Sequence, residues 1–523
     1  MSGAPLDVRP FISAPSQPVP PSDAPSGPHS RPGVVDHAAI IALLGGAQAL
    51  ILIAGLLRWK IIALFLGPSG VGIAGIIDQA AQVVLQLGAL NIPTAALRFL
   101  AIARQNRGAA GFAGLYRAFL RMLLSATAIA AVGALMVYLL RPGTLGVGMG
   151  SYRTAVIFAL VAVPLTGATN LLRNVLATLH RHRTVALILL GSSALLAAST
   201  VLGLRVGGLG GAYLAAFIVA AATVSALHGV VKTTLVETPG QNTGALLGLL
   251  KAHPDIVRFS ITLYAVGFAV PLGYSLVRWT VLGRLGIEEA GFLAAAYTVA
   301  AGLRAVFSAA STQYLIPLTS RDLPKQERAT EVARYIRTLA LLLLVAALPL
   351  LLFPHELLVT LYSRKFISAT DVIGIFILAE IVMAIGDAYR VLQLGFNDLI
   401  GYFMTTCGSV VVVAANITWV VAGHGLLGAA LLQVAGAAVA LLWSIARIRS
   451  RHGIAVEWRS LALIAYVLTA LTAAVAVGRA APEPGLTETA LKATAALCVA
   501  AGAWFLMPRS ERVALLRSIP FRT

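Results

Sequence analysis

Six cationic side chains lie inside long apolar stretches of the sequence. They are Arg58, Lys60, Arg173, Arg278, Arg304 and Arg390. A charge within an apolar membrane helix costs about 3 kcal/mol, so it is usually kept where it meets a partner or a water-filled cavity. Guanidinium groups that converge suit a phosphate or pyrophosphate, because their planar fork donates hydrogen bonds in pairs and stays charged when desolvated. We therefore treat these six residues as candidates for binding an anionic substrate.

A second interpretation applies to cations near helix ends, whose long side chains can extend to the lipid headgroups. For Arg58 and Lys60 both interpretations stay open, and the two cannot face one cavity because residues i and i+2 point to nearly opposite sides of a helix. For Arg304, in the centre of its stretch, the cavity is favoured. Asp387 precedes Arg390 by three residues and is a local partner for it.

Polar and acidic residues accompany these cations. Asp78, Gln82 and Gln86 follow at intervals of four residues and form one stripe on a helix, which serves either sugar binding or helix–helix hydrogen bonding. Glu380 and Asp387 share one face of another helix and can carry a coupling ion or neutralise an arginine. Glu380 has no cation three or four residues away, so it is the better coupling candidate; Asp78 is the third.

Composition places all of these residues in a membrane. The chain has 523 residues, of which 59% are hydrophobic and 11% charged, with a mean hydropathy of +0.88. Soluble domains carry about 25% charged residues. The net charge of +19 collects on one side of the expected crossings, which sets orientation by the positive-inside rule and indicates no nucleic-acid partner. No metal-binding spacing and no cofactor motif is present, and the two cysteines are far apart in sequence.

The order of apolar stretches predicts an all-α integral membrane fold with about fourteen transmembrane helices. Arg58-Trp59 recurs as Arg278-Trp279, and glycine pairs five residues apart follow both copies. This repeat predicts two pseudo-symmetric six-helix lobes around a central cavity, plus a C-terminal helix pair, with both termini cytoplasmic. The predicted segments are a disordered Pro-rich tail (1–36), an N-lobe (37–232), a linker (233–257), a C-lobe (258–450), the extra pair (451–508) and a basic tail (509–523). We expect Arg321 to Arg337 to form a charged loop.

Several dispersed motifs carry a resemblance to a known family. They are Gly55-Leu56-Leu57 with Lys60 and Gly67-Pro68-x-Gly70-x-Gly72, then Tyr314 to Ser320, Phe366 to Asp371, and His424 to Ala430. In this order they resemble the Wzx-type polysaccharide flippases, including the lipid III and O-antigen translocases, of the multidrug/oligosaccharidyl-lipid/polysaccharide (MOP) exporter superfamily. The Pro-rich tail and the extra helix pair depart from the twelve-helix members, and the missing Gly-x-Arg pattern after Arg173 departs from the family's usual sequence.

The resemblance implies a flippase of the bacterial inner membrane rather than an enzyme. Its substrate would be an undecaprenyl-pyrophosphate-linked oligosaccharide, such as an O-antigen or exopolysaccharide repeat unit, moved to the periplasmic leaflet by alternating access. The family's cavity cations receive the pyrophosphate, a role that the resemblance assigns to Lys60, Arg278 and Arg304, with Arg58 beside them. Membrane lipids, the polysaccharide polymerase and the chain-length machinery are the other partners implied.

Two alternatives come from other functional classes. An ion-coupled exporter of drugs or cations within the same superfamily would need an acidic cavity, whereas the cations within the expected crossings outnumber Asp78, Glu380 and Asp387. A membrane-embedded glycan polymerase or ligase would need a large outer loop with paired catalytic groups, and every predicted outer loop is short.

Overall fold

The structure, a computed structural model, describes residues 34–141, 143, 149–179, 181–235, 254–320, 324–454, 456–480, 485–509 and 511–513. Its elements are α1 (Val34–Ala89), α2 (Ile92–Leu140), η2 (Met149–Tyr152), α3 (Arg153–Val161), α4 (Val163–Thr178), α5 (His182–Thr234), α7 (Pro254–Leu285), α8 (Ile287–Ser320), α9 (Lys325–Leu352), α10 (Pro354–Leu361), η3 (Arg364–Ala369), α11 (Thr370–Gly395), α12 (Leu399–His452), α13 (Trp458–Ala480) and α14 (Leu486–Leu506). The expected all-α fold is confirmed. The Pro-rich tail and most of the linker lie outside these residues.

Eleven helices in the described part of the chain are long and apolar enough to cross a membrane. One crossing needs about 20 residues, yet three of these stretches run to 38, 52 and 54 residues. Each is interrupted by a glycine with positive φ, at Gly67 (67°), Gly208 (56°) and Gly425 (58°). Residues with a Cβ rarely adopt this conformation, so glycine permits the break. The breaks fall at the predicted turns between consecutive crossings, while the total of fourteen stays a prediction.

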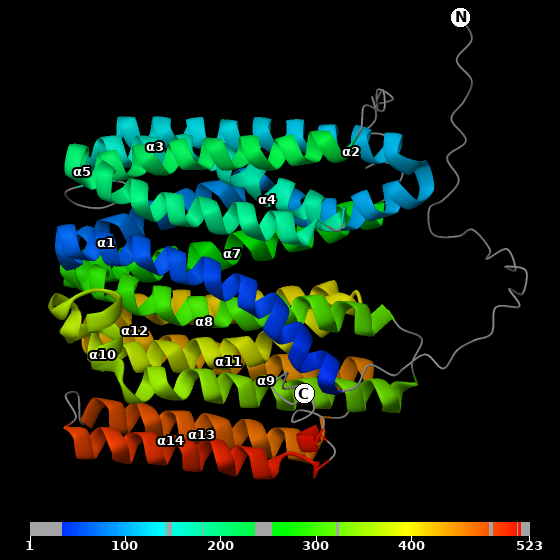
Figure 1. The fold of residues 1–523 in the computed structure, drawn as a ribbon, viewed down its shortest axis with the longest axis vertical. Coiled ribbons are helices and arrows are strands. Elements are labelled where there is room, and N and C mark those ends of the chain that lie inside the picture. The colour runs from blue at the N-terminus through cyan, green and yellow to red at the C-terminus, as the bar shows by residue number, and fades with distance from the viewer. Residues whose placement is uncertain are drawn as a thin grey trace, which may run out of the picture.

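The helices lie side by side in one elongated bundle (Figure 1). Helices α2 to α5 form one part, α7 to α12 form the next, and α13 with α14 lie at the far edge. The element α1 joins the first two parts, because it packs on α5 and α2 and also along α8 and α7. The predicted lobe boundaries stay predictions, but the juncture between α1 and the α7–α8 pair is where residues from both repeats meet.

The charged segment in the first turns of α9 corrects one expectation. We expected a loop from Arg321 to Arg337, but α9 already begins at Lys325. Helix formation continues beyond the apolar stretch because its charges find partners: Arg334 pairs with Glu331 one turn earlier at 2.8 Å. The helix then ends at Leu352, because Pro354 lacks the N–H needed to continue it.

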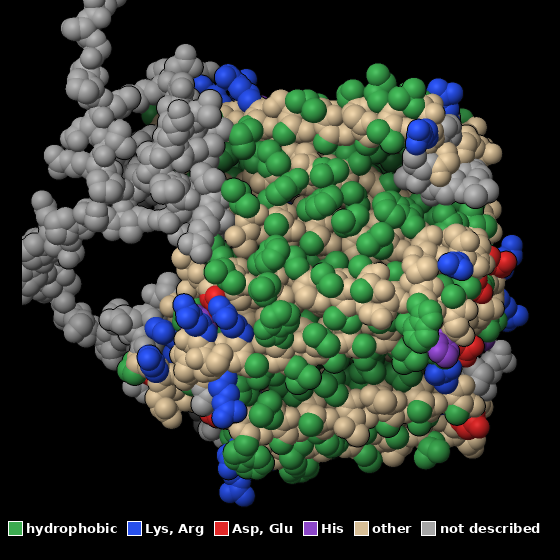
Figure 2. All heavy atoms as spheres, turned by 180° about the vertical axis from the view of Figure 1, so that it is seen from behind, with side chains coloured by type: hydrophobic (Ala, Val, Ile, Leu, Met, Phe, Trp, Pro, Cys, Tyr) green, Lys and Arg blue, Asp and Glu red, His purple; other side chains and the backbone are tan. Residues whose placement is uncertain are grey.

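The outer surface has the distribution of a multi-pass membrane protein. Figure 2 shows hydrophobic side chains over the middle of one face, with charged side chains gathered towards the two ends of the helices. Large apolar side chains such as Ile129, Leu202 and Trp419 are exposed on the bundle. Exposure of this extent is costly in water and favourable in lipid.

Candidate functional site

The two sequence repeats meet at a closely packed seam between α1 and α8. A Cβ added at Gly291 would lie 2.0 Å from the carbonyl oxygen of Pro68, and one added at Gly72 would lie 2.5 Å from the carbonyl oxygen of Ile287. Only glycine allows the two backbones to approach this closely. The repeated glycines therefore lock one copy of the motif against the other, and they position the polar residues on either side of the seam.

On the N-terminal side, Arg58 and Asp78 of α1 form an ion pair at 3.3 Å. The hydroxyl group of Tyr213, on α5, donates to the same carboxylate at 2.6 Å. The Arg58 guanidinium also lies 5.5 Å from the centre of the Tyr213 ring, within the range of a cation–π contact. Arg58 thus has an acidic partner, an arrangement that the sequence did not indicate because the two residues lie on different sides of the Gly67 break.

Arg278, the repeat counterpart of Arg58, has a different environment. It lies on α7 and is 9% exposed. Its Nη1 donates to the carbonyl oxygen of Gly75 on α1 at 2.5 Å, and its guanidinium lies 5.2 Å from the centre of the Tyr297 ring on α8. Among the described residues no carboxylate forms an ion pair with it. Arg278 is therefore a buried cation at the seam without a direct ion-pair partner among the described residues, although the Asp78 carboxylate is close enough to attract it.

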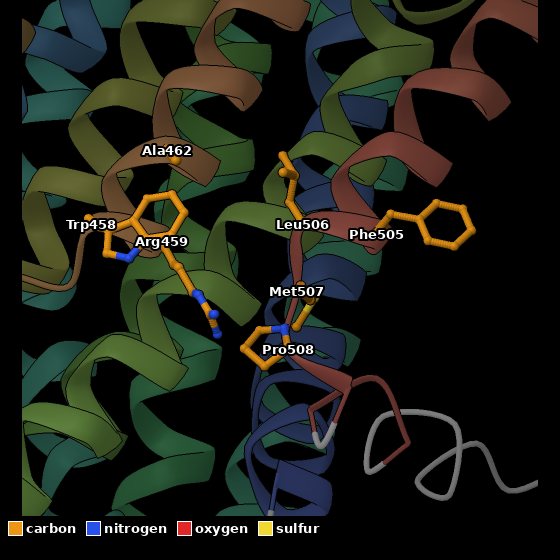
Figure 3. A pocket seen from close by; sticks show the side chains of 7 residues that line it. All are labelled: Trp458, Arg459, Ala462, Phe505, Leu506, Met507 and Pro508. Carbon is orange, nitrogen blue, oxygen red and sulfur yellow. The ribbon is translucent and has the colours of Figure 1, made fainter.

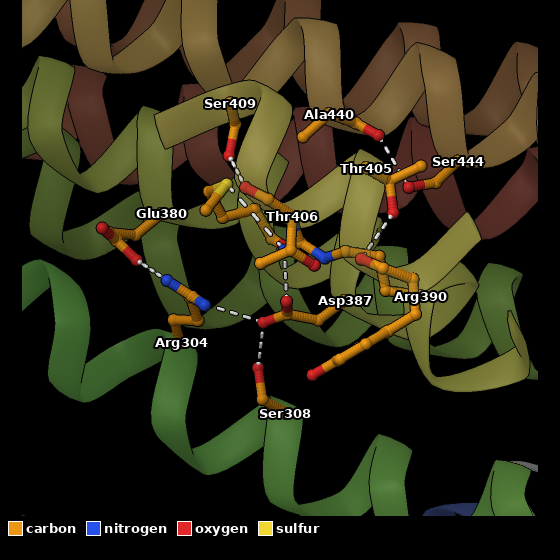
Figure 4. Close-up of polar contacts among 12 residues, drawn as sticks. Arg304, Ser308, Glu380, Asp387, Arg390, Thr405, Thr406, Ser409, Ala440 and Ser444 are labelled. Atoms are coloured by element: carbon orange, nitrogen blue, oxygen red, sulfur yellow. Dashed lines mark hydrogen bonds and ion pairs between the residues drawn. The ribbon is translucent and has the colours of Figure 1, made fainter. Parts of the chain in front are cut away.

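On the C-terminal side, Arg304 of α8 lies between two carboxylates of α11 (Figure 4). Its Nε is 2.7 Å from Asp387 Oδ2 and its Nη1 is 3.0 Å from Glu380 Oε2. The Glu380 side chain is completely buried, whereas that of Arg304 remains 21% exposed. The Arg304 side chain is therefore partly exposed, while the Glu380 carboxylate that it contacts is buried.

Further polar groups complete this cluster. Ser308 donates to Asp387 at 2.7 Å, and Arg390 pairs with the other oxygen of the same carboxylate, as predicted from their spacing. Tyr274 on α7 lies 3.3 Å from Arg304, and the amide of Gln433 on α12 donates to Glu380 at 3.3 Å. Two arginines and two carboxylates give the cluster a balanced formal charge, whereas Arg278 forms no direct ion pair with a described carboxylate.

The aromatic rings of Tyr297 and Tyr274 connect the two environments. Their centres are 4.9 Å apart, with Arg278 over one ring and Arg304 hydrogen-bonded to the hydroxyl group of the other. We call the set Arg58, Asp78, Tyr213, Arg278, Tyr297, Tyr274, Arg304, Glu380 and Asp387 the polar belt. It crosses from α5 through the seam to α11.

The remaining candidates lie at different places. Lys60 donates to the backbone carbonyl of Thr360 on α10 at 2.7 Å, so it points away from the Asp78 partner of Arg58, as their spacing predicts. Arg173 on α4 is exposed. Gln82 is exposed on α1, and a Cβ added at Gly267 of α7 would lie 3.4 Å from Gln86 Oε1, which places this glutamine beside the other repeat.

The tyrosines are candidate site residues that the sequence analysis did not single out. Tyr213, Tyr274 and Tyr297 all lie well inside apolar helices, where a hydroxyl group needs a partner. Their position inside apolar helices is the signal in the sequence that could have identified them. Among the residues the structure describes, no group of three or more His, Cys, Asp or Glu side chains is placed to hold a metal ion.

Comparison with known proteins shows what the chain is similar to in sequence and in fold. No protein-family model matches the chain. The lipid III flippase of Escherichia coli K12 is 22% identical over 390 residues, which cover 72% of this chain and 89% of the flippase. The solved lipid II flippase MurJ, in an inward closed conformation, superposes with a TM-score of 0.64 at 10% identity and covers 88% of this chain and 97% of its own.

An inward-facing multidrug resistance transporter of the MATE family superposes with a TM-score of 0.57 at 14% identity, over 80% of this chain and 98% of the transporter. These structural likenesses show a fold shared with transporters of the MOP superfamily. The resemblance found in the sequence motifs is thereby confirmed.

Proposed function

We propose that this chain is a flippase of the bacterial inner membrane. It moves an undecaprenyl-pyrophosphate-linked oligosaccharide, an O-antigen or exopolysaccharide repeat unit, from the cytoplasmic to the periplasmic leaflet by alternating access. The similarity to the E. coli lipid III flippase supports the substrate class. The observation that carries the proposal is the buried Arg278 at the seam between the repeats, which forms no direct ion pair with a described carboxylate.

An anionic group bound at Arg278 would offset the free-energy cost of burying the charge of this side chain. Burying a charge without an ion-pair partner is unfavourable by several kcal/mol. A bound pyrophosphate would supply that partner, and the attraction would favour its binding. Arg58 and Arg304 flank this position along the polar belt and are the next candidates for the substrate phosphates. Gln82 and Gln86 are candidates for sugar hydroxyl groups. Lys60, Arg173 and Arg390 are candidates of lower rank, because they lie respectively at α10, on an exposed surface and behind Asp387.

Glu380 and Asp387 are candidates for the coupling step. Both carboxylates now hold Arg304. A pyrophosphate that drew Arg304 towards itself would leave Glu380 buried without its cation, and a proton would then be favoured on that carboxyl group. Substrate binding and proton uptake would in this way be coupled to one another. Asp78, paired with Arg58, offers the same arrangement in the other repeat.

The test is glycan export in a strain whose own copy of the gene is deleted. Arg278→Gln should stop export, with the lipid-linked glycan accumulating on the cytoplasmic face of the inner membrane. A lost charge-assisted contact of about 1.5 to 3 kcal/mol corresponds to roughly 10- to 150-fold weaker binding. Arg284→Gln is the matched control, since this arginine lies exposed on the same helix. Normal export by the Arg278 variant would contradict the proposal.

The exporter alternative predicts a different phenotype. A cationic drug would be repelled by Arg278, so an exporter of cations would gain activity, or keep it, when that charge is removed. Unchanged surface glycan in the deletion strain, together with increased sensitivity to cationic drugs, would favour the exporter.

A further inference from the structure

A pocket with a volume of about 300 Å³ lies between the first turn of α13 and the last turn of α14 (Figure 3). It is lined by Trp458, Arg459, Ala462, Phe505, Leu506, Met507 and Pro508. Helix α13 packs on α9 and α11, and α14 packs on α9 and α13, at the edge of the bundle opposite α2 and α5 (Figure 1). The pocket is therefore separate from the polar belt and needs an explanation of its own.

Two arginines are free of acidic partners in the described part of the chain: Arg459, which lines the pocket, and Arg512, which does not line it but lies over the ring of its lining residue Phe505. Arg459 lies 5.8 Å from the centre of the Trp458 ring, and Arg512 lies 5.6 Å from the centre of the Phe505 ring. The neighbouring carboxylates of Glu457 and Glu511 are both taken by the buried Arg337 of α9. The pocket thus keeps a positive charge that no described acidic side chain neutralises.

The aromatic partners of these arginines face outward. Trp458 and Phe505 are each 72% exposed. Tryptophan and other aromatic residues collect where a membrane helix meets the headgroup layer, and these two mark the ends of α13 and α14. Leu461 and Leu506, beside them, are exposed apolar side chains that can accompany an acyl chain. Charge and apolar surface therefore adjoin at one membrane boundary.

We infer that this pocket binds the phosphate headgroup of an anionic glycerophospholipid. Basic pockets between transmembrane helices recognise such headgroups, because each Lys or Arg near the surface contributes about 1 kcal/mol of attraction. The N-terminus of α13 adds the partial positive charge of unpaired N–H groups to that of Arg459. The volume is at the lower limit for a small-molecule site, so it suits a headgroup and excludes an oligosaccharide.

The bound lipid also has a structural consequence. Arg337 ties Glu457 and Glu511, which flank α13 and α14, to α9. At the other end, Lys492 of α14 donates to the carbonyl oxygen of Leu352 at the end of α9, at 3.1 Å. A lipid between α13 and α14 would fill the remaining opening between two helices that are already held against α9.

The experiment is native mass spectrometry of the purified full-length protein, titrated with phosphatidylglycerol or with phosphatidylcholine in neutral detergent. The unsubstituted protein should retain one phosphatidylglycerol more tightly than phosphatidylcholine. Arg459→Gln with Arg512→Gln should weaken this adduct about 30-fold, which is about fivefold for each lost charge. Thermal unfolding of the double variant reports whether it remains folded, since neither arginine is buried.

Arg451→Gln is the matched control, because this exposed arginine in the last turn of α12 lies at the same basic end and does not line the pocket. Its phosphatidylglycerol affinity should match that of the unsubstituted protein. Equal affinity in the double variant and the unsubstituted protein would overturn the inference, as would an equal loss in the Arg451 variant. Displacement of the phospholipid by a short-chain prenyl pyrophosphate would also overturn it, because the site would then belong to the transported lipid.

Discussion

Glu380, completely buried on α11, accepts a hydrogen bond at 3.0 Å from Arg304, which lies 76 residues earlier in the chain. The same guanidinium holds Asp387 at 2.7 Å. Arg304 therefore fastens α8 to α11 beside the seam between the repeats. Removal of the Arg304 side chain would leave the buried Glu380 carboxylate without its cation. It would also remove one cation from the candidate substrate site.

Arg304→Gln should destabilise the protein strongly. The substitution leaves the Glu380 carboxylate buried without a cation, and breaking a buried ion pair on one side costs about 3 to 5 kcal/mol. Arg304→Gln with Glu380→Gln should be more stable than the single variant, because Asp387 keeps Arg390 as its partner. Thermal unfolding in detergent, arranged as a double-mutant cycle, measures the coupling. A double variant no more stable than Arg304→Gln would contradict it.

Gly291→Ala should separate the seam. The new methyl group would lie 2.0 Å from the Pro68 carbonyl oxygen, so α1 and α8 would have to move apart. Overpacking of this kind costs about 1 to 3 kcal/mol. The measurement is again the unfolding temperature in detergent. Gly283→Ala is the control, because a Cβ there meets nothing within 4 Å, and alanine also favours the helix. Equal effects of the two substitutions would show that the seam is not closely packed.

Lys60→Met should loosen the tie between α1 and α10. The lysine donates to Thr360 at an exposed position, so its loss should lower the free energy of unfolding by about 1 kcal/mol or less. Opening at the adjacent Gly67 turn should nevertheless become more frequent. Maleimide labelling of Ser69→Cys, in a background without Cys407 and Cys498, should be faster in the Lys60 variant. Lys232→Met, an exposed lysine on α5, should leave the labelling rate unchanged.

Asp398 should make the stability of the folded protein depend on pH. Hydrogen bonds from Arg447, with that from the Gly401 N–H, lower the pKa of this carboxyl group to about 2 in the folded protein. An unfolded aspartate titrates near pH 4. A lowered folded pKa stabilises the protein above the unfolded value, and this stabilisation is lost as the pH falls from about 4 through 2.

Asp398→Asn should therefore unfold at a lower temperature than the unsubstituted protein at pH 7, with the difference shrinking towards pH 2. Asparagine keeps an oxygen that can accept from Gly401, so the comparison isolates the charge. Thermal unfolding between pH 7 and pH 2.5 measures this. A difference that is constant over that range would exclude the ion pair with Arg447 as its cause.

Local patterns predicted most of the fold. Apolar stretches marked the helices, and the glycines at 67, 208 and 425 marked breaks within continuous helical elements. Hydrophobicity did not predict the first turns of α9, where charged residues that pair one turn apart form a helix outside the apolar stretch. The prediction followed hydrophobicity alone, whereas helix formation needs satisfied backbone groups and compatible neighbours, which that segment also has.

The candidate site was predictable only in part. Arg390 and Asp387 were correctly paired, because three residues of separation place two side chains on one helix face. Glu380 looked unpaired by the same rule, yet Arg304 from α8 holds it. The tyrosines of the polar belt were overlooked, because a tyrosine inside an apolar helix shows no partner until another helix packs against it.

The sequence by itself determined that this protein is helical, lies in a membrane, repeats its motif and keeps cations inside its apolar helices. Those properties follow from residue type and from periodicity over a few turns. Only the tertiary structure decided that Arg58 and Arg304 have acidic partners while Arg278 does not. Repeat symmetry places Arg58 and Arg278 alike, but the charge each one meets depends on which helix packs beside it. That choice is made by contacts between distant segments, and it distinguishes a cation with a direct acidic partner from one without.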